Sequence, residues 1–141
     1  MNRIKAMLQE HEGKRAKLYQ DTGGIPHIGV GRNLNNGLRD DEIDLMLEND
    51  IQQCIEECAS AFPWFNTLDQ ARQDVLTMLC FNMGLPRLNQ FVKTLALIQE
   101  GKFEESATEL LDSRWAAQVG DNRSSTLAAM LSSGDYPGGS D

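Results

Sequence analysis

Two carboxylic acids near the start of the chain have the spacing and the surroundings that acid and base chemistry requires. Glu12 is followed by Gly13 at the end of a predicted helix, and Asp21 opens an Asp-Thr-Gly-Gly turn nine residues later. Two carboxyl groups in different environments can divide the roles of acid and base between them, as glycoside cleavage requires. Asp in such a turn also commonly hydrogen-bonds its own backbone, so the pair alone leaves a structural role for Asp21 open.

The position of Glu12 favours the protonated form of its side chain. Ile4, Met7 and Leu8 recur at helical spacing, and Gly13 is typical of the residue just after a helix end. The partial negative charge at the C-terminal end of a helix disfavours a second negative charge there. A carboxylic acid that keeps its proton can give it to a departing sugar oxygen, so Glu12 is the candidate general acid.

The elements that must position these acids follow from hydrophobic periodicity. Helical spacing vanishes over residues 15–34, where Ile25 to Gly31 alternates as a strand does, and a β-hairpin or three-stranded sheet is expected. Apolar residues at steps of three and four then predict one long helix over residues 40–61, which begins with acidic residues. Further helices are expected over residues 2–12, 68–83, 89–99, 102–113 and 123–132.

The predicted fold class is α+β and mainly α. A small lobe of about residues 13–39 carries the sheet, and the long helix joins it to a helical lobe of about residues 63–134. The first helix is expected to pack on the larger lobe. Residues 1–134 then form a single domain, and residues 135–141 are expected to be a disordered tail.

Composition excludes several classes of protein. The 141 residues include 13 Lys and Arg against 21 Asp and Glu, and a net charge of −8 argues against binding to nucleic acid. No run approaches the ~18 to 20 apolar residues of a membrane span. Cys54, Cys58 and Cys80 have no CxxC spacing and no nearby His, so they are interpreted as reduced thiols of the core, with no metal site and no cofactor.

Residues 10–34 read EHEGKRAKLYQDTGGIPHIGVGRNL. This string resembles the active-site segment of the phage-type lysozymes, the family of the T-even phage endolysins (glycoside hydrolase family 24). The shared pattern is Glu-Gly, nine residues from Glu to Asp, Asp-Thr, a Gly and then Ile-Gly-hydrophobic-Gly. Further similar stretches are Glu48-Asn49-Asp50-Ile51, Phe81-Asn82-Met83-Gly84, Ser113-Arg114-Trp115 and Asn122-Arg123. The resemblance covers almost the whole chain up to residue 134.

The resemblance implies a lysozyme-like fold and an enzyme that hydrolyses β-1,4 bonds between N-acetylmuramic acid and N-acetylglucosamine. Glu12 would be the general acid, and Asp21 would help to orient and activate a water that attacks the far face of the muramic acid C1. In such an inverting arrangement the two carboxyl groups stand about 6.5 to 9.5 Å apart. Phe81, Asn82 and Trp115 would line or brace the substrate cleft, and Arg123 would lie near Glu12 and balance its charge.

The resemblance also implies partners and a site of action. The substrate would be peptidoglycan glycan strands, cleaved during lysis of a bacterial host, with no metal or cofactor. Met1 leads directly into a polar, periodic stretch without a secretory leader, so synthesis in the host cytoplasm is expected. Action in the periplasm would then depend on release by a pore-forming, holin-type protein. A monomer is expected.

The sequence departs from the family pattern at His27, where the family has a catalytic Thr six residues after the Asp. Three interpretations remain open. His27 could act as base for a repositioned water with Asp21 orienting it, it could bring about a retaining course that favours transfer to sugar acceptors, or it could weaken the enzyme.

A second departure is Arg32, where the T-even phage member has His. Because Asp50 matches the acidic partner of that His, we expect a structural ion pair between Arg32 and Asp50.

The main alternative is a catalytically weakened lysozyme-fold protein that binds the cell wall or acts as a scaffold. His27 and the acidic net charge, which fits poorly with an anionic wall, favour this alternative. The presence of both Glu12 and Asp21 favours the enzyme.

Overall fold

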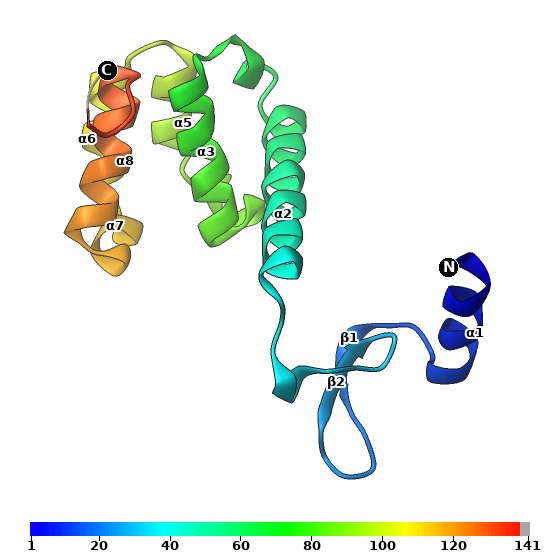
Figure 1. Ribbon diagram of the computed structural model, residues 1–141. Coiled ribbons are helices and arrows are strands. Elements are labelled where there is room, and N and C mark those ends of the chain that lie inside the picture. The colour runs from blue at the N-terminus through cyan, green and yellow to red at the C-terminus, as the bar shows by residue number, and fades with distance from the viewer. Residues whose placement is uncertain (139–141) are drawn as a thin grey trace. The chain divides into compact units, whose positions relative to one another are not determined.

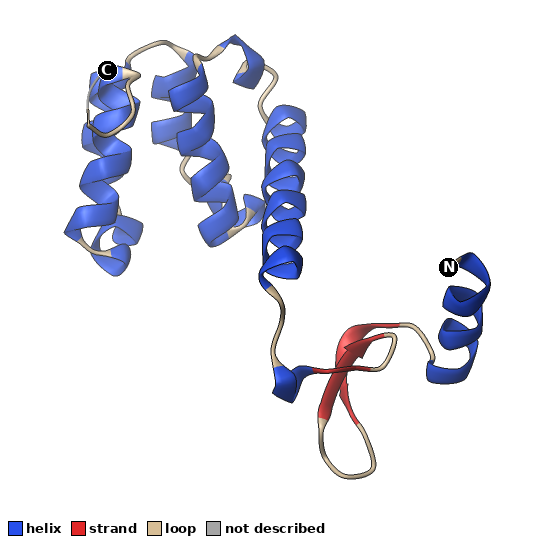
Figure 2. Ribbon diagram, in the orientation of Figure 1, coloured by secondary structure: helices blue, strands red, loops and turns tan. Residues whose placement is uncertain are grey.

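The structure is a computed structural model that describes residues 1–138. In this part of the chain a small antiparallel sheet lies near the N-terminus and the rest is mostly helical, which confirms the predicted α+β fold class (Figure 2). The elements are α1 (Asn2–Glu12), β1 (Arg15–Gln20), β2 (Pro26–Gly29), β3 (Arg32–Asn33), α2 (Asp40–Ala61), α3 (Gln70–Met83), α4 (Leu85–Leu88), α5 (Val92–Gln99), α6 (Phe103–Leu111), α7 (Arg114–Val119) and α8 (Asp121–Ser133) (Figure 1).

The chain divides into two compact units, Met1–Met46 and Leu47–Asp141, here called unit 1 and unit 2. Each unit is described by itself. The packing of the first helix on the helical lobe therefore stays a prediction.

Unit 1 is built from α1 and the three strands. The backbone N–H of Gly13, at φ +79°, donates to the carbonyl of Gln9 and ends α1 where the sequence predicted. The strands are antiparallel in the order β1-β2-β3, and the register places His27 opposite both Tyr19 and Asn33. One row of side chains therefore crosses all three strands.

The start of α2 is specified by charge. Asp40, Asp41 and Glu42 lie in its first turn, where the positive end of the helix dipole stabilises acidic side chains. Glu42 also accepts a hydrogen bond of 2.9 Å from the backbone N–H of Arg39, which satisfies a donor that the helix leaves unpaired.

Unit 2 contains all the fully buried side chains of the described residues. Helix α6 packs against α5 and α8, and α3 and α7 also contact α8. Helix α3 contributes buried residues from several of its sides, as expected for a helix at the centre of a bundle. The largest fully buried side chains are Trp115, Phe65, Leu76, Leu79, Leu88, Ile98, Leu110 and Leu131.

Two details of the helical unit differ from the sequence prediction. The helix expected over residues 89–99 begins only at Val92, and a separate single turn, α4, precedes it with Pro86 in its first turn. Helix α7 was not predicted because its six residues are too few for a periodic pattern. Its signal was Ser113, whose hydroxyl caps the N-terminus by accepting from the backbone N–H of Ala116.

Arg72 ties α3 to the end of α8. Its guanidinium donates to the carbonyls of Leu131 at 2.8 Å and Ser132 at 2.9 Å, and it lies 3.5 Å from the ring centroid of Phe103. It also pairs with Asp69, the residue that caps α3. One cation thus satisfies carbonyls that the end of α8 leaves unpaired.

Within unit 2, the segment after α8 contacts α3 through Tyr136. Its hydroxyl donates to Oδ2 of Asp74 on α3 at 2.5 Å, although the sequence assigns residues 135–141 to a disordered tail. Residues 139–141 of that tail lie outside the described residues.

The three cysteines are free thiols, with Cys58 and Cys80 buried and Cys54 half-buried. Burial raises the pKa of Cys58 to about 11, since a thiolate there would lose its hydration. No helix within residues 1–138 is both long enough and apolar enough to cross a membrane.

Candidate active site

Glu12 ends α1 with its carboxyl group against the turn between β2 and β3. A Cβ atom placed on Gly31 would lie 3.1 Å from Oε2 of Glu12, tighter than most Cβ contacts, so the carboxyl group would have to shift by a few tenths of an ångström. Gly31 also has φ +66°, a conformation that strains side-chain-bearing residues. The backbone therefore favours glycine there, and a larger residue would displace the carboxyl group of Glu12.

Asp21 uses its two carboxylate oxygens differently. Oδ1 accepts hydrogen bonds from the backbone N–H groups of Gly23 at 2.8 Å and Ile25 at 2.9 Å, and so stabilises the turn between β1 and β2. Oδ2 has no hydrogen-bond donor among the described residues and lies 3.8 Å from Nδ1 of His27. The structural role is therefore present, and it leaves one oxygen for chemistry.

His27 lies on β2 with its two ring nitrogens in different environments. Nδ1 is 2.9 Å from the carbonyl oxygen of Ile25. A carbonyl only accepts, so Nδ1 carries the proton in this bond and Nε2 has the lone pair in the neutral ring. Nε2 has no hydrogen-bond partner within residues 1–138. No side-chain nitrogen or oxygen of the described residues is both buried and without a partner, so Nε2 is open to solvent.

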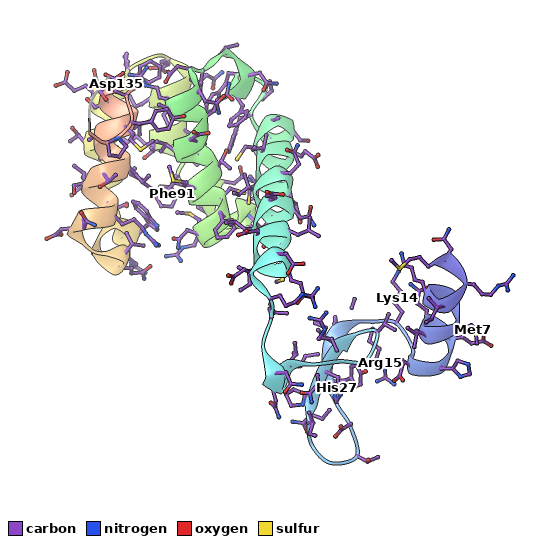
Figure 3. The ribbon with its side chains drawn as sticks, in the orientation of Figure 1. Met7, Lys14, Arg15, His27, Phe91 and Asp135 are labelled. Atoms are coloured by element: carbon purple, nitrogen blue, oxygen red, sulfur yellow. The ribbon has the colours of Figure 1, made fainter. Side chains whose placement is uncertain are left out.

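Two further residues lie beside His27 and were given no role by sequence reasoning. The Tyr19 ring is stacked on the imidazole with centroids 5.6 Å apart and an interplanar angle of 25°. Arg15 lies over the Tyr19 ring, 4.5 Å from its centroid. Figure 3 labels Arg15 and His27 on the sheet. Their spacing on one predicted strand was the available signal, because residues four apart in a strand share a face.

Arg32 makes an ion pair within unit 1. Its guanidinium lies 2.5 Å from Oε2 of Glu42. The hydrogen bond from Arg32, together with the one from the backbone of Arg39, lowers the pKa of Glu42 to about 2. The pairing with Asp50 stays a prediction, because Asp50 belongs to unit 2.

The predicted substrate-binding residues lie in unit 2, and the structure brings two of them together. Nε1 of Trp115 donates to Oδ1 of Asn82 at 2.9 Å, and the indole is 1% exposed. Trp115 therefore braces Asn82 at the end of α3. Phe81, at 49% exposed, and Arg123 have exposed side chains. Substrate binding by Phe81, Asn82, Trp115 and Arg123, and the approach of Arg123 to Glu12, stay predictions.

The described residues contain no group of three or more His, Cys, Asp or Glu side chains arranged to hold a metal ion. The chemistry available at the site is that of a carboxyl group at a helix end and an Asp-His pair on a small sheet. Together with the mainly helical α+β fold, these features define a protein of the lysozyme-like class.

A family model described as phage lysozyme matches residues 9–130. The chain therefore belongs to the phage lysozyme family. Membership of this family supports a muramidase-type lysozyme function and implies peptidoglycan as the substrate.

The curated relatives are distant but similar over most of this chain. Probable T4-type lysozyme 2 of Dictyostelium discoideum is 27% identical over 93% of this chain and 94% of its own length. Probable T4-type lysozyme 1 of the same organism has the same identity and coverage. The pre-baseplate central spike protein Gp5 of Enterobacteria phage T4 is 25% identical over 92% of this chain but only 27% of its own length.

Proposed function

We propose that the protein is a peptidoglycan muramidase that hydrolyses the β-1,4 bond between N-acetylmuramic acid and N-acetylglucosamine, with Glu12 as general acid. The observation that carries the proposal is the pairing of Asp21 with His27. Among the described residues, Oδ2 of Asp21 accepts no hydrogen bond and Nε2 of His27 has no hydrogen-bond partner. Two such groups can direct an attacking water.

The reaction proceeds by proton transfers at named atoms. Glu12 gives its proton to the glycosidic oxygen as the bond from C1 to that oxygen breaks. Oδ2 of Asp21 orients the attacking water, and Nε2 of His27 accepts the water's proton as its oxygen bonds to C1. The imidazolium that results is stabilised by the carboxylate of Asp21, 3.8 Å from Nδ1.

The experiment compares Glu12→Gln with Glu10→Gln in turbidity assays on permeabilised Gram-negative cells. Loss of the acid proton is expected to lower the rate by about 10²- to 10⁴-fold. Glu10 is exposed on the same helix, so its variant is the matched control and is expected to keep wild-type activity. Wall binding without lysis by the wild-type protein would instead identify a scaffold.

The course of the reaction is tested by digesting purified peptidoglycan in heavy-oxygen water and analysing the muropeptides by mass spectrometry. Hydrolysis places the label on every new reducing end. Unlabelled ends, or products extended by sugar transfer, would contradict simple hydrolysis and favour the retaining, transglycosylating course.

We further propose that the enzyme acts as a monomer in lysis of a bacterial host. It would be made in the host cytoplasm and reach the periplasmic peptidoglycan through a holin-type pore. Family membership supports this proposal. Co-expression with and without a holin tests it, because lysis without one would contradict the dependence.

A further inference from the structure

The face of the sheet that carries His27 is organised as a stack of three side chains. Tyr19 is directly opposite His27 in the strand register, and the two rings are stacked at 5.6 Å. The guanidinium of Arg15 also lies over the Tyr19 ring, 4.5 Å from its centroid. Cross-strand aromatic pairs and cation–π contacts each stabilise one arrangement of such side chains.

The stack restricts how His27 can present its nitrogens. An imidazole stacked on Tyr19 at an interplanar angle of 25° is restricted in its plane but can still be turned over, which exchanges the positions of Nδ1 and a ring carbon. The hydrogen bond from Nδ1 to the carbonyl of Ile25 exists in only one of these two orientations. The plane set by Tyr19 and the bond to Ile25 therefore act together to select one tautomer, with its lone pair on Nε2.

The charged groups near the imidazole are few. Oδ2 of Asp21 lies 3.8 Å from Nδ1, and the guanidinium of Arg15 lies over the neighbouring Tyr19 ring. The side chain of His27 is 16% exposed. The Tyr19 hydroxyl makes no hydrogen bond with the rest of the described chain, so its contribution to the stack comes from the ring.

We propose that Tyr19, held by Arg15, is a positioning residue that fixes the plane of His27 and thereby keeps Nε2 as the proton-accepting atom. The catalytic meaning of this arrangement rests on the proposed function, in which His27 is the base. The positioning itself is a property of the resting protein and is measurable without substrate.

Long-range ¹H–¹⁵N NMR of the full chain reads the tautomer directly. The sequence contains two histidines, and exposed His11 on α1 provides the internal reference. At alkaline pH, where imidazole side chains are neutral, we expect His27 of the wild-type protein to show a protonated Nδ1 and an unprotonated Nε2. Tyr19→Leu is expected to give a mixture of both tautomers, whereas Tyr19→Phe retains the single one because it keeps the ring.

Kinetics separates positioning from substrate binding. Tyr19→Leu is expected to lower kcat by roughly tenfold with little change in KM, because the base is misplaced while the bound sugar is not. Tyr19→Phe recovers most of the wild-type kcat. In a His27→Ala background Tyr19→Leu is expected to cost nothing further, because the side chain that it positions is gone.

Mixed tautomers in the wild-type protein, or a spectrum unchanged by Tyr19→Leu, would overturn the positioning role. Should Tyr19→Leu fail to fold, Arg15→Gln takes its place, since Arg15 is exposed and its loss only loosens the stack. A spectrum unchanged in Arg15→Gln would then overturn the proposal. Inactivity of the wild-type enzyme contradicts the proposed function and leaves the NMR result interpretable.

Discussion

Asp21 illustrates how a residue with a common structural role can leave one oxygen free for the catalytic role proposed for it. Its Oδ1 is committed to the backbone of Gly23 and Ile25, while Oδ2 faces His27. Sequence reasoning identified both roles but treated them as alternatives. The structure assigns the turn to one oxygen and leaves the other available, which spacing alone could not reveal.

The contact between Gly31 and Glu12 gives the first prediction. Gly31→Ala would place a methyl group 3.1 Å from Oε2 of Glu12, so the carboxyl group must move. We expect muramidase activity to fall by roughly ten- to hundredfold, since small displacements of a catalytic group are costly. Turbidity assays measure the activity of the variant, and thermal melts measure its stability.

The control for this variant is Gly37→Ala. Gly37 has a similar positive φ of +75°, but its Cβ would meet no atom within 4 Å. Both variants are expected to lose about 1 to 2 kcal/mol of stability through backbone strain. Equal activity in the two variants would show that the carboxyl group of Glu12 does not depend on Gly31.

At the scale of elements, the ion pair of Arg32 and Glu42 links β3 to the start of α2. Hydrogen bonds from the Arg32 side chain and the Arg39 backbone lower the pKa of Glu42 from its ordinary value of 4.5 to about 2. A carboxyl group with a depressed pKa in the folded state stabilises the fold above its unfolded value. This stabilisation is lost as the pH falls from 4.5 towards 2.

The second prediction follows from this pH range. Glu42→Gln is expected to be less stable than the wild-type protein above pH 4.5, and the difference should disappear as the pH approaches 2. Chemical denaturation across this range measures it. Glu48→Gln is the control, because Glu48 lies exposed on the same helix and has no ion pair in the part of the chain that the structure describes. A pH-independent difference would contradict the linkage.

The third prediction concerns the tie between α3 and α8. Arg72 is 13% exposed and donates to two carbonyls at the end of α8. We expect Arg72→Met to lower the free energy of unfolding by about 2 to 4 kcal/mol, since charged donors to half-buried carbonyls are lost. Urea denaturation gives the value.

Arg87→Met is the matched control for Arg72. Arg87 is exposed and donates to Gln118 alone among the described residues. Its replacement should therefore change the free energy of unfolding by no more than about 0.5 kcal/mol. Similar decreases in the free energy of unfolding of both variants would mean that the contacts of Arg72 stabilise the fold no more than those of an exposed Arg.

At the scale of the whole molecule, burial is unevenly distributed. The buried core runs from Cys58 to Leu131 in unit 2, and unit 1 taken by itself has no fully buried side chain. Segments with few buried contacts open at lower free energy than the core. We therefore expect backbone amides of residues 15–33 to exchange with heavy water well before those of α3 (Gln70–Met83), as hydrogen-exchange mass spectrometry would measure. Equal protection would contradict this prediction.

The long elements were predictable from the sequence and the short ones were not. Periodicity predicted α1 and α2 because each buries or presents one continuous apolar stripe, and the Gly-rich turns located the sheet. Helix α7 and the break before α5 escaped prediction because one or two turns hold too few residues for a period. The ion pair of Arg32 with Glu42 was not predicted, because Glu42 was counted only as part of an acidic helix start.

The side-chain arrangement at the site also lay beyond the sequence. The residue types of Glu12, Asp21 and His27 were recognisable from their spacing. The spacing of Arg15 and Tyr19 indicates a shared strand face, but the stacking of Tyr19 on His27 depends on the pairing of β1 with β2, whose register is irregular between Arg15 and Tyr19.

The separation of buried core and reactive side chains has a consequence for how this lineage can change. Glu12, Asp21 and His27 all lie in the unit without fully buried residues, so replacements among them disturb little of the packing that keeps the chain folded. Proteins tolerate mutation only while their stability stays above a threshold. A change of residue at position 27 would therefore leave most of the fold intact, and natural selection would act on the altered chemistry.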